Sequence, residues 1–329
     1  MEKSTTLKEI AYELDLSINT VSRALRDCDN VNKETKKKVI DMAIKLGYMP
    51  MTQTQFVKRE NKKNITFIIG DIKNVFYLIN CKYLANIISS HGDDYTTLMF
   101  FDGDCVGAND IKQIIAQRGD GIISLLHFDE ESLSICKLQK IPLVFLSVAK
   151  MIGISDVVHY DVQNATDLVV NYLLNYHKNK TLVYVGYLEN YESINRLRCL
   201  KNSLNKMNET YNLICLDALK QCNDIYELIK KKNGYLSLIC FSDSVCYEFL
   251  EYLNQVLPNI RLIYPQLHIV SFDALAKHVS GFIDITTIDY DYEESCKKSC
   301  EILYKKFELL NDEVQTIILP VDLHIRRIK

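Results

Sequence analysis

The residues with the most specific chemistry occupy positions 17 to 26, where hydroxyl, amide and guanidinium side chains are interleaved with apolar ones. Asn19 can pair in bidentate fashion with adenine and Arg23 with guanine, and each such pair discriminates between bases by ~1–3 kcal/mol. Ile18 can contact a thymine methyl group. Phosphate oxygens, which fix register without reading sequence, suit the small hydroxyl side chains of this run: Ser17, Thr20 and Ser22. These residue types indicate contacts with double-stranded DNA.

The spacing of apolar residues predicts a helix-turn-helix that would present this run to a major groove. Thr6 and Glu9 form an S/T-x-x-E capping box, so a first helix begins there. Ser17 is a good N-cap for a second helix. The second helix has an inner apolar stripe made by Val21, Ala24 and Leu25. The alternative is an ordinary antiparallel helix pair within a core.

A third helix is predicted to follow, with Asn32 as its N-cap and Gly47 as its left-handed C-terminal stop. Its exposed lysines can approach a phosphate backbone, although a lysine run is more often a solvated face. Pro50 disfavours continuation of the helix, and the residues after it are polar. The sequence therefore predicts a small all-α headpiece over residues 1–49 and a linker over residues 50–62.

This N-terminal stretch resembles the DNA-binding headpiece of the lactose-repressor (LacI/GalR) family of transcription factors. The family pattern T-L-x-D/E-I-A…V-S-x-x-T-V-S-R-x-L runs from Thr6 to Leu25. Asp15 stands at the turn where the family has Gly, and Asp tolerates a left-handed conformation better than most residues. The resemblance implies that the DNA contacts are made by Leu7, Ser17, Ile18, Asn19, Thr20, Ser22, Arg23, Asn32, Tyr48, Thr54 and Val57.

The linker resembles the family's hinge helix, which folds on operator binding, pairs with its dimer partner and inserts an apolar wedge into the minor groove. Tyr48 and Pro50 match the family's Tyr-x-Pro entry. The family's Asn, Ala and Leu that follow are replaced here by Met51, Thr54 and Val57. Val and Thr are weaker helix formers, and Val offers less surface to insert, so we expect a smaller wedge.

From Asn64 onward, short apolar runs alternate with longer helical patterns, which predicts an α/β body with parallel sheets covered on both faces. Two successive sets of strands indicate two lobes that enclose a cleft at the carboxyl ends of the strands. The expected strands are Ile65–Ile69, Tyr95–Phe101, Gly121–Leu126, Leu143–Leu146, Leu182–Val185, Leu213–Leu216, Leu236–Phe241, His268–Phe272 and Thr286–Ile288. The expected helices include Phe76–Ser90 and Val162–Tyr176.

The family resemblance extends over this body through ITFIIGDIKNVFY, RGDGIISLL, IPLVFLSV, INRLRCLKNSL, LICFSDSVCYEFL and IVSFDALA, in the expected order and spacing. It implies a fold similar to periplasmic sugar-binding proteins, in which two lobes are joined by three crossovers and hold a ligand between them. The effector-binding and dimerisation core would be residues 63–329. Its lobes would be about residues 63–160 plus 291–320, and 161–290 plus 321–329.

Arg198 and Asp273 match the family's effector-binding arginine and aspartate. A guanidinium donates a fork of hydrogen bonds and a carboxylate accepts two, which suits adjacent sugar hydroxyls. Taken alone, either residue is more often a surface charge or an ion-pair partner. Phe76 is a candidate stacking face, with ordinary core packing as the alternative. Three further positions carry serine where many family members have Asn or Asp: Ser124, Ser147 and Ser242.

Charge and composition limit the other classes of protein. Residues 1–63 hold 13 Lys and Arg against 9 Asp and Glu, whereas the remainder holds 26 against 33, so a basic end precedes an acidic body. The 11 cysteines include no CxxC pair and read as small core residues in a reducing cytosol. Cys296 and Cys300 lie one helical turn apart, where face packing is favoured over a redox or metal pair. No metal-ligand spacing, catalytic constellation or Gly-rich phosphate loop is present, so we expect no enzyme activity and no cofactor.

These features together predict a cytoplasmic, sequence-specific DNA-binding regulator. The resemblance implies a homodimeric repressor on a pseudo-palindromic double-stranded operator, controlled by a small-molecule effector, a carbohydrate or its derivative. No secretory signal opens the sequence and no apolar run approaches the ~18 residues of a membrane span. The main alternative is a solute-binding protein without DNA-binding regulation. A second alternative is an enzyme that binds DNA incidentally.

Overall fold

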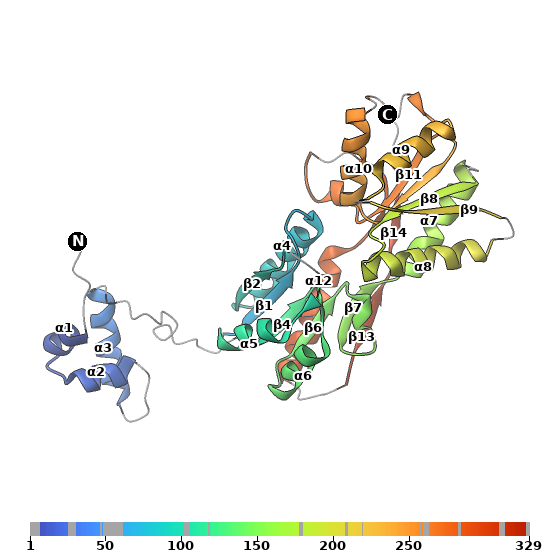
Figure 1. Cartoon of the computed structure of the whole chain (residues 1–329). Helices are drawn as coiled ribbons and strands as arrows, with labels where there is room; N and C mark the ends of the chain where they lie inside the picture. The colour runs from blue at the N-terminus through green and yellow to red at the C-terminus, as the bar shows by residue number, and fades with distance from the viewer. Residues whose placement is uncertain are drawn as a thin grey trace. The chain divides into compact units, whose positions relative to one another are not determined.

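The protein is described from a computed structural model, in which the chain divides into two compact units, Met1–Lys62 and Lys63–Lys329 (Figure 1). The residues that the structure describes are 7–25, 31–46, 48, 62–101, 105–117, 119–177, 180–207, 210–218, 220–256, 258, 263–281, 284–308 and 313–326. Thr6, Gly47, Pro50, Met51, Thr54 and Val57 fall outside these ranges, so the capping box, the helix stop and the hinge remain predictions.

The first unit contains three helices: α1 (Leu7–Glu13), α2 (Ile18–Leu25) and α3 (Lys33–Lys45). Ser17 caps α2, because its Oγ accepts the backbone N–H of Thr20 at 3.0 Å. The turn between α1 and α2 places Asp15 at a φ of 51°, so the left-handed conformation expected of this Asp is confirmed. The three helices pack around one small core, built from Ile10, Ala11, Val21, Ala24, Leu25, Val39 and Ala43.

The second unit contains two six-stranded sheets, and all but one of their strand pairings are parallel. The predicted α/β class with a helical headpiece and a two-lobed core is confirmed. The first sheet has the order β13-β7-β6-β4-β1-β2, with β1 Asn64–Ile69, β2 Asp94–Met99, β4 Gly121–Ser124, β6 Leu143–Leu146, β7 Asp156–Tyr160 and β13 Thr316–Leu319. A two-stranded parallel pair lies beside it, formed by β3 (Cys105–Val106) and β5 (His127–Phe128).

The second sheet has the order β14-β12-β11-β10-β8-β9. Its strands are β8 Thr181–Gly186, β9 Asn212–Asp217, β10 Ser237–Cys240, β11 His268–Phe272, β12 Thr286–Asp289 and β14 Asp322–His324. Only β14 runs antiparallel to its neighbour, pairing His324 with Thr287. Because β13 belongs to the first sheet and β14 to the second, the chain passes between the lobes three times: after β7, after β12 and after β13.

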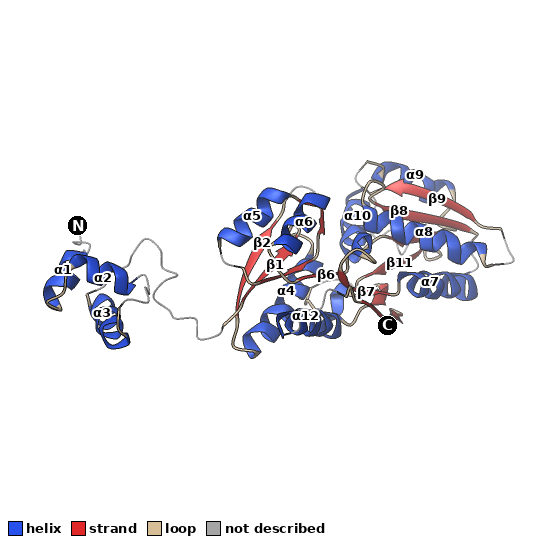
Figure 2. Ribbon diagram, turned by 90° about the horizontal axis from the view of Figure 1, so that it is seen from below, coloured by secondary structure: helices blue, strands red, loops and turns tan. Residues whose placement is uncertain are grey.

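Helices cover both faces of the sheets (Figure 2). On the first lobe these are α4 (Val75–Ser90), α5 (Ala108–Ala116), α6 (Glu130–Leu138) and α12 (Tyr292–Glu308). On the second they are α7 (Val162–His177), α8 (Tyr191–Asn205), α9 (Cys222–Lys231) and α10 (Asp243–Val256). Two short 3-10 turns, η2 (Ala149–Met151) and η3 (Leu275–Lys277), follow β6 and β11. Among the described residues, no helix combines the length and the apolar character needed to cross a bilayer.

The sequence places most of the central strands but misses the buried β7, the short pair β3 and β5, and the edge strands β13 and β14. Apart from Leu319, the side chains of the two late edge strands are exposed or half-buried, so these strands lack the continuous apolar run that identifies a central strand. The β7 strand is fully buried, yet Asp156 and His159 interrupt its apolar pattern. Three expected strands also end early, at Met99, Ser124 and Cys240.

The buried face of α4 gives a direct test of this packing. Leu84 is fully buried in the large core of the second unit, whereas Leu138 at the end of α6 is 79% exposed. Leu84→Ala should lower the free energy of unfolding by about 2–5 kcal/mol, because it removes buried methyl groups and leaves a cavity. Leu138→Ala, the matched control, should change it by less than about 0.5 kcal/mol in urea denaturation. Equal losses in the two variants would contradict the packing described here.

Candidate nucleic-acid interface and interlobe cleft

The second helix of the first unit has one buried face and one exposed face. Val21, Ala24 and Leu25 point into the small core, while Ile18, at 45% exposed, lies on the outer side. Asn19 and Arg23 are also exposed. The amide and guanidinium predicted to read bases are therefore presented together on one surface of α2.

The other predicted DNA contacts of the first unit have structural roles as well. Ser17 and Thr20 share a side-chain hydrogen bond of 2.8 Å at the start of α2, and Ser22 is half-buried. Asn32 is exposed and caps α3 by accepting the backbone N–H of Thr35 at 2.7 Å. Two residues pack against the small core instead of standing free of it: Leu7 and Tyr48.

In the second unit, a buried ion pair lies at the carboxyl end of the second sheet. Nη2 of Arg196, on α8, lies 3.5 Å from Oδ1 of Asp273, which directly follows β11. The guanidinium also donates a hydrogen bond to the backbone carbonyl of Phe241. It is packed against three aromatic rings, with its carbon 4.7 Å from the Phe241 centroid, 4.8 Å from that of Phe272 and 5.8 Å from that of Tyr290.

A second carboxylate shares the environment of this guanidinium. Asp243, at the start of α10, accepts hydrogen bonds from the Thr287 hydroxyl and the Leu275 backbone N–H, both at 2.8 Å. Burial raises the pKa of Asp273 to about 7 and that of Asp243 to about 6, although the charge of Arg196 opposes both shifts. One cation therefore faces two buried carboxyl groups, and their mutual repulsion favours a bound proton.

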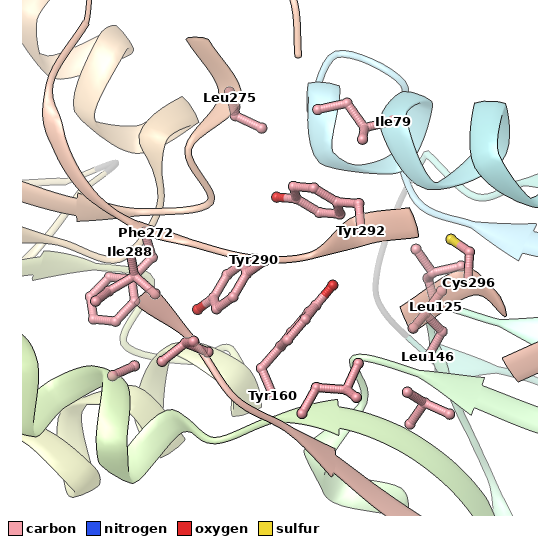
Figure 3. Packing of buried hydrophobic residues seen from close by; sticks show 14 of the residues in the cluster. Ile79, Leu125, Leu146, Tyr160, Phe272, Leu275, Ile288, Tyr290, Tyr292 and Cys296 are labelled. Atoms are coloured by element: carbon pink, nitrogen blue, oxygen red, sulfur yellow. The ribbon is translucent and has the colours of Figure 1, made fainter. Parts of the chain in front are cut away.

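Three tyrosines mark the crossovers between the lobes (Figure 3). The rings of Tyr160 and Tyr290 are stacked, with centroids 4.2 Å apart. Tyr292 donates a hydrogen bond of 2.8 Å to the carbonyl of Asp273. Phe76, the predicted stacking face, is half-buried and meets Tyr292 edge-on at 5.9 Å. Aromatic surface from both lobes thus gathers around the ion pair.

The three predicted serines differ in their hydrogen bonds. Ser124 donates to the carbonyl of Leu126 at 2.6 Å and so closes its own turn. Ser242 accepts the backbone N–H of Val245 at 3.2 Å, which caps α10. Ser147 has a φ of 61°, and its buried hydroxyl has no hydrogen-bond partner within the described part of the chain. Tyr290 likewise carries a buried hydroxyl without a partner there.

The lobes also contact each other through polar side chains. The Ser244 hydroxyl of α10 donates to Oδ1 of Asn74, which caps α4, at 3.1 Å. From α8, Glu192 accepts the backbone N–H of Ala149 at 2.7 Å. The other carboxylate oxygen of Glu192 lies 3.5 Å from Nε2 of His159, on β7.

Comparison with known proteins identifies the N-terminal unit. Residues 6–51 match the family described as bacterial regulatory proteins, lacI family. The chain is 45% identical over 74 residues to the HTH-type transcriptional regulator RegA of Clostridium saccharobutylicum, covering 22% of each chain. It is 32% identical over 129 residues to the repressor CytR of Escherichia coli K12, covering 38% of this chain and 36% of CytR. These two alignments thus span well under half of either relative.

Similarity over the full length comes from other comparisons. The regulator pepR1 of Lactobacillus delbrueckii subsp. lactis is 25% identical over 341 residues, covering 98% of this chain and 97% of pepR1. The lac repressor dimer bound to operator and the anti-inducer ONPF has a TM-score of 0.68 at 17% identity, covering 98% of both chains. The N-terminal unit therefore matches the LacI family, and the whole chain has the fold of these regulators. A complex of the regulator CelR with cellobiose has the same fold, with a TM-score of 0.63 at 17% identity, covering 98% and 99% of the chains.

The structure does not bring the predicted Arg198 to Asp273, because Arg196 occupies that place. Arg198 is exposed, and its Nη2 donates to Oδ1 of Asn195 at 2.6 Å. The two arginines lie two positions apart on α8, so they face different sides of the helix. The motif INRLR contains both, and the resemblance alone selected the outer one.

Several residues around the ion pair and between the lobes were not predicted from the sequence at all: Glu192, Arg196, Asp243 and Tyr290. These residues come from separate elements and meet only in the folded structure. In the sequence each of them looks like an ordinary charged or aromatic residue. Of these residues, only Asp243 could have been suggested by its place in the sequence, because it directly follows the predicted Ser242. Within the described residues, no group of three or more His, Cys, Asp or Glu side chains is placed to hold a metal ion.

The raised pKa of Asp243 predicts a pH-dependent stability. Because its folded-state pKa of about 6 lies above that of an ordinary aspartate, the native state holds this proton more tightly, and that stabilisation is lost as the pH rises through about 6. From about pH 4 to pH 7, wild type should lose on the order of 2 kcal/mol more unfolding free energy than Asp243→Asn, measured by urea denaturation. Asp224→Asn, at an exposed position of the same lobe, is the control and should follow wild type. Parallel curves for wild type and Asp243→Asn would refute the assignment.

Proposed function

We propose that this chain is a sequence-specific DNA-binding transcriptional regulator, and specifically a repressor, that responds to a small molecule bound between its two lobes. The single observation that carries the proposal is the outer face of α2, where Asn19 and Arg23 stand exposed in a helix-turn-helix that matches the lacI family. An exposed amide and guanidinium on a helix that follows a short turn are the groups that read base edges in a major groove.

The partner is double-stranded DNA carrying a pseudo-palindromic operator, bound by a homodimer. A single headpiece reaches only a few base pairs, so pairing two headpieces by a two-fold axis is the economical way to obtain specificity. The excess of positive charge in residues 1–63 supports contact with phosphates there. Thr54 and Val57 of the linker are proposed to join the minor-groove contacts and to connect headpiece and body.

The effector is proposed to bind at Arg196 and Asp273, with a carbohydrate or its derivative as the chemical class. The guanidinium can donate to two adjacent hydroxyls and the carboxylate can accept from others. The hydroxyls of Ser147 and Tyr290 add two buried polar atoms that would gain from a partner. Phe76, with Ser124 and Ser242 behind the cleft walls, completes the proposed site. CelR bound to cellobiose supports a sugar as the class of ligand.

Control of DNA binding would follow from the way the lobes close. An effector that contacts both lobes favours one relative orientation of them, and it shifts the population only by the difference in its affinity for the two orientations. The first lobe begins at Lys63, directly after the linker, so its movement alters the spacing of two headpieces in a dimer. By linkage, effector and operator must change each other's affinity by one common factor.

The alternative is a solute-binding protein that does not regulate DNA, and the cleft alone would fit it. The headpiece opposes this interpretation, since a solute receptor has no use for an exposed reading helix. Electrophoretic mobility shifts with genomic fragments would separate the two functions, because only the regulator retains a specific fragment against excess competitor DNA. As a DNA-binding protein it is proposed to act in the cytoplasm, without enzymatic turnover.

Arg23→Ala tests the reading helix. It should weaken operator binding by ~1–3 kcal/mol and relax base preference at one position of each half-site, because a bidentate guanine contact is lost. Lys37→Ala, on the exposed side of α3, is the control and should weaken binding uniformly across sequences. Selection of binding sites from a random library measures both effects. An unchanged consensus for Arg23→Ala would remove Arg23 from base recognition.

Arg196→Lys and Arg198→Lys together test the effector site. Lys cannot reproduce the planar fork of Arg, so Arg196→Lys should abolish the effect of the ligand on operator affinity. Arg198→Lys should leave that effect intact, because Arg198 is exposed and bonds to Asn195. The measurement is operator affinity with and without a sugar that shifts the wild-type value. The opposite pattern would return the role to Arg198, as the sequence suggested.

A further inference from the structure

Glu192 links the two lobes through His159. Whether the carboxylate attracts or repels the imidazole depends on one proton of that ring. Glu192 extends from α8 of the second lobe, and its side chain is 27% exposed. One carboxylate oxygen accepts the backbone N–H of Ala149 at 2.7 Å, and the other lies 3.5 Å from Nε2 of His159. Both partners belong to the first lobe, in η2 and β7. We call these three residues the interlobe bridge.

The hydrogen bond on the far side of His159 determines which nitrogen carries its proton. Nδ1 lies 2.8 Å from the carbonyl oxygen of Tyr160, and the side chain is almost fully buried. A carbonyl oxygen can only accept, so Nδ1 must donate. A neutral imidazole has one N–H, which leaves a lone pair on Nε2 facing the Glu192 carboxylate. A protonated imidazole donates from both nitrogens and forms an ion pair across the lobes.

Other charged groups near the bridge do not replace Glu192 in this role. Arg196, one turn further along α8, pairs with Asp273 and also interacts with the charge of Glu192. Tyr290, from the crossover after β12, stays neutral because burial raises its pKa. The β13 neighbour of His159 in register is the apolar Ile318. Other charged groups on adjoining elements include the exposed Lys150 of η2, and Asp156 of β7 with its partner Lys306 of α12, 3.0 Å apart.

We propose that His159 and Glu192 form a proton-controlled bridge that favours closure of the two lobes as the pH falls. The direction of this effect follows from the tautomer of His159. Only the protonated imidazole attracts the carboxylate, so the closed orientation binds the proton more tightly and is favoured when His159 carries it. The bridge regulates the same cleft as the proposed effector. Its effect on DNA binding rests on the proposed function, whereas the closure itself does not.

Fluorescence energy transfer across the lobes can measure this closure in the full chain. Positions 138 and 235 carry exposed side chains, one in each lobe, and accept dyes through unnatural amino acids, which avoids the native cysteines. In wild type, lowering the pH from about 8 to about 5.5 should raise the closed-to-open ratio about fivefold. No ligand and no DNA are added.

Two variants remove the proton control by different routes. Glu192→Gln keeps an oxygen for the Ala149 N–H and offers an amide donor to the neutral imidazole, so its response to pH should vanish or reverse. His159→Gln removes the titrating group and should give one ratio at both pH values. Circular dichroism spectra that match wild type confirm that each variant is folded, and two independent variants protect the test if one of them does not fold.

Two other histidines provide controls. His324 pairs with Asp284 at 2.8 Å, but both residues lie in the second lobe, so His324→Gln should keep the wild-type response. His278 packs edge-on against Tyr292 at 4.9 Å, and burial lowers its pKa. Burial therefore disfavours its protonation, and His278→Gln should also keep the wild-type response.

A wild-type response that persists in Glu192→Gln and His159→Gln would overturn the proposal, as would its loss in His324→Gln. A wild-type ratio that does not change with pH would also overturn it. None of these results bears on operator recognition, since neither DNA nor effector is present. Failure of the bridge and failure of the proposed function are therefore separable: the first appears in energy transfer, the second in mobility shifts.

Discussion

One buried guanidinium between two carboxyl groups is the constraint on which the body of this protein depends. Arg196 comes from α8, Asp273 from the end of β11 and Asp243 from the start of α10, so one charge cluster ties together three elements of the second lobe. Removing one partner from such a cluster leaves an uncompensated buried charge, which costs several kcal/mol. The positions of these chain segments are thereby fixed before any ligand is considered.

The same atoms are the ones proposed to bind a ligand, and this would set the energetics of recognition. Arg196 already donates to the Phe241 carbonyl and pairs with Asp273, so a sugar hydroxyl must compete with internal partners. The net gain from exchanging one hydrogen bond for another is small. Larger gains come from atoms that have no partner in the described structure, the hydroxyls of Ser147 and Tyr290. Selectivity among ligands would then arise chiefly at these two hydroxyls.

How much the sequence could predict depended on whether the signal was local. Capping by Ser17, the left-handed Asp15 and continuously apolar strands such as β1 follow from short patterns, and these were predicted. Edge strands such as β14 were missed, because half-exposed side chains leave no apolar run. The sequence pointed to Arg198 and not to Arg196 as the partner of Asp273 for another reason. Residues two positions apart on a helix differ by about 200° in direction, and only the packing of α8 decides which arginine faces Asp273.

The third crossover has a consequence for the order in which the protein is made. The β13 strand completes one sheet and β14 the other, and only two residues separate them. Every other strand of both sheets has been synthesised before these two leave the ribosome. Domains usually fold as units during synthesis, and N-terminal ones fold first. The three-helix unit can therefore fold on the nascent chain while both sheets still lack an edge strand, and α2 exists before either lobe of the body is complete.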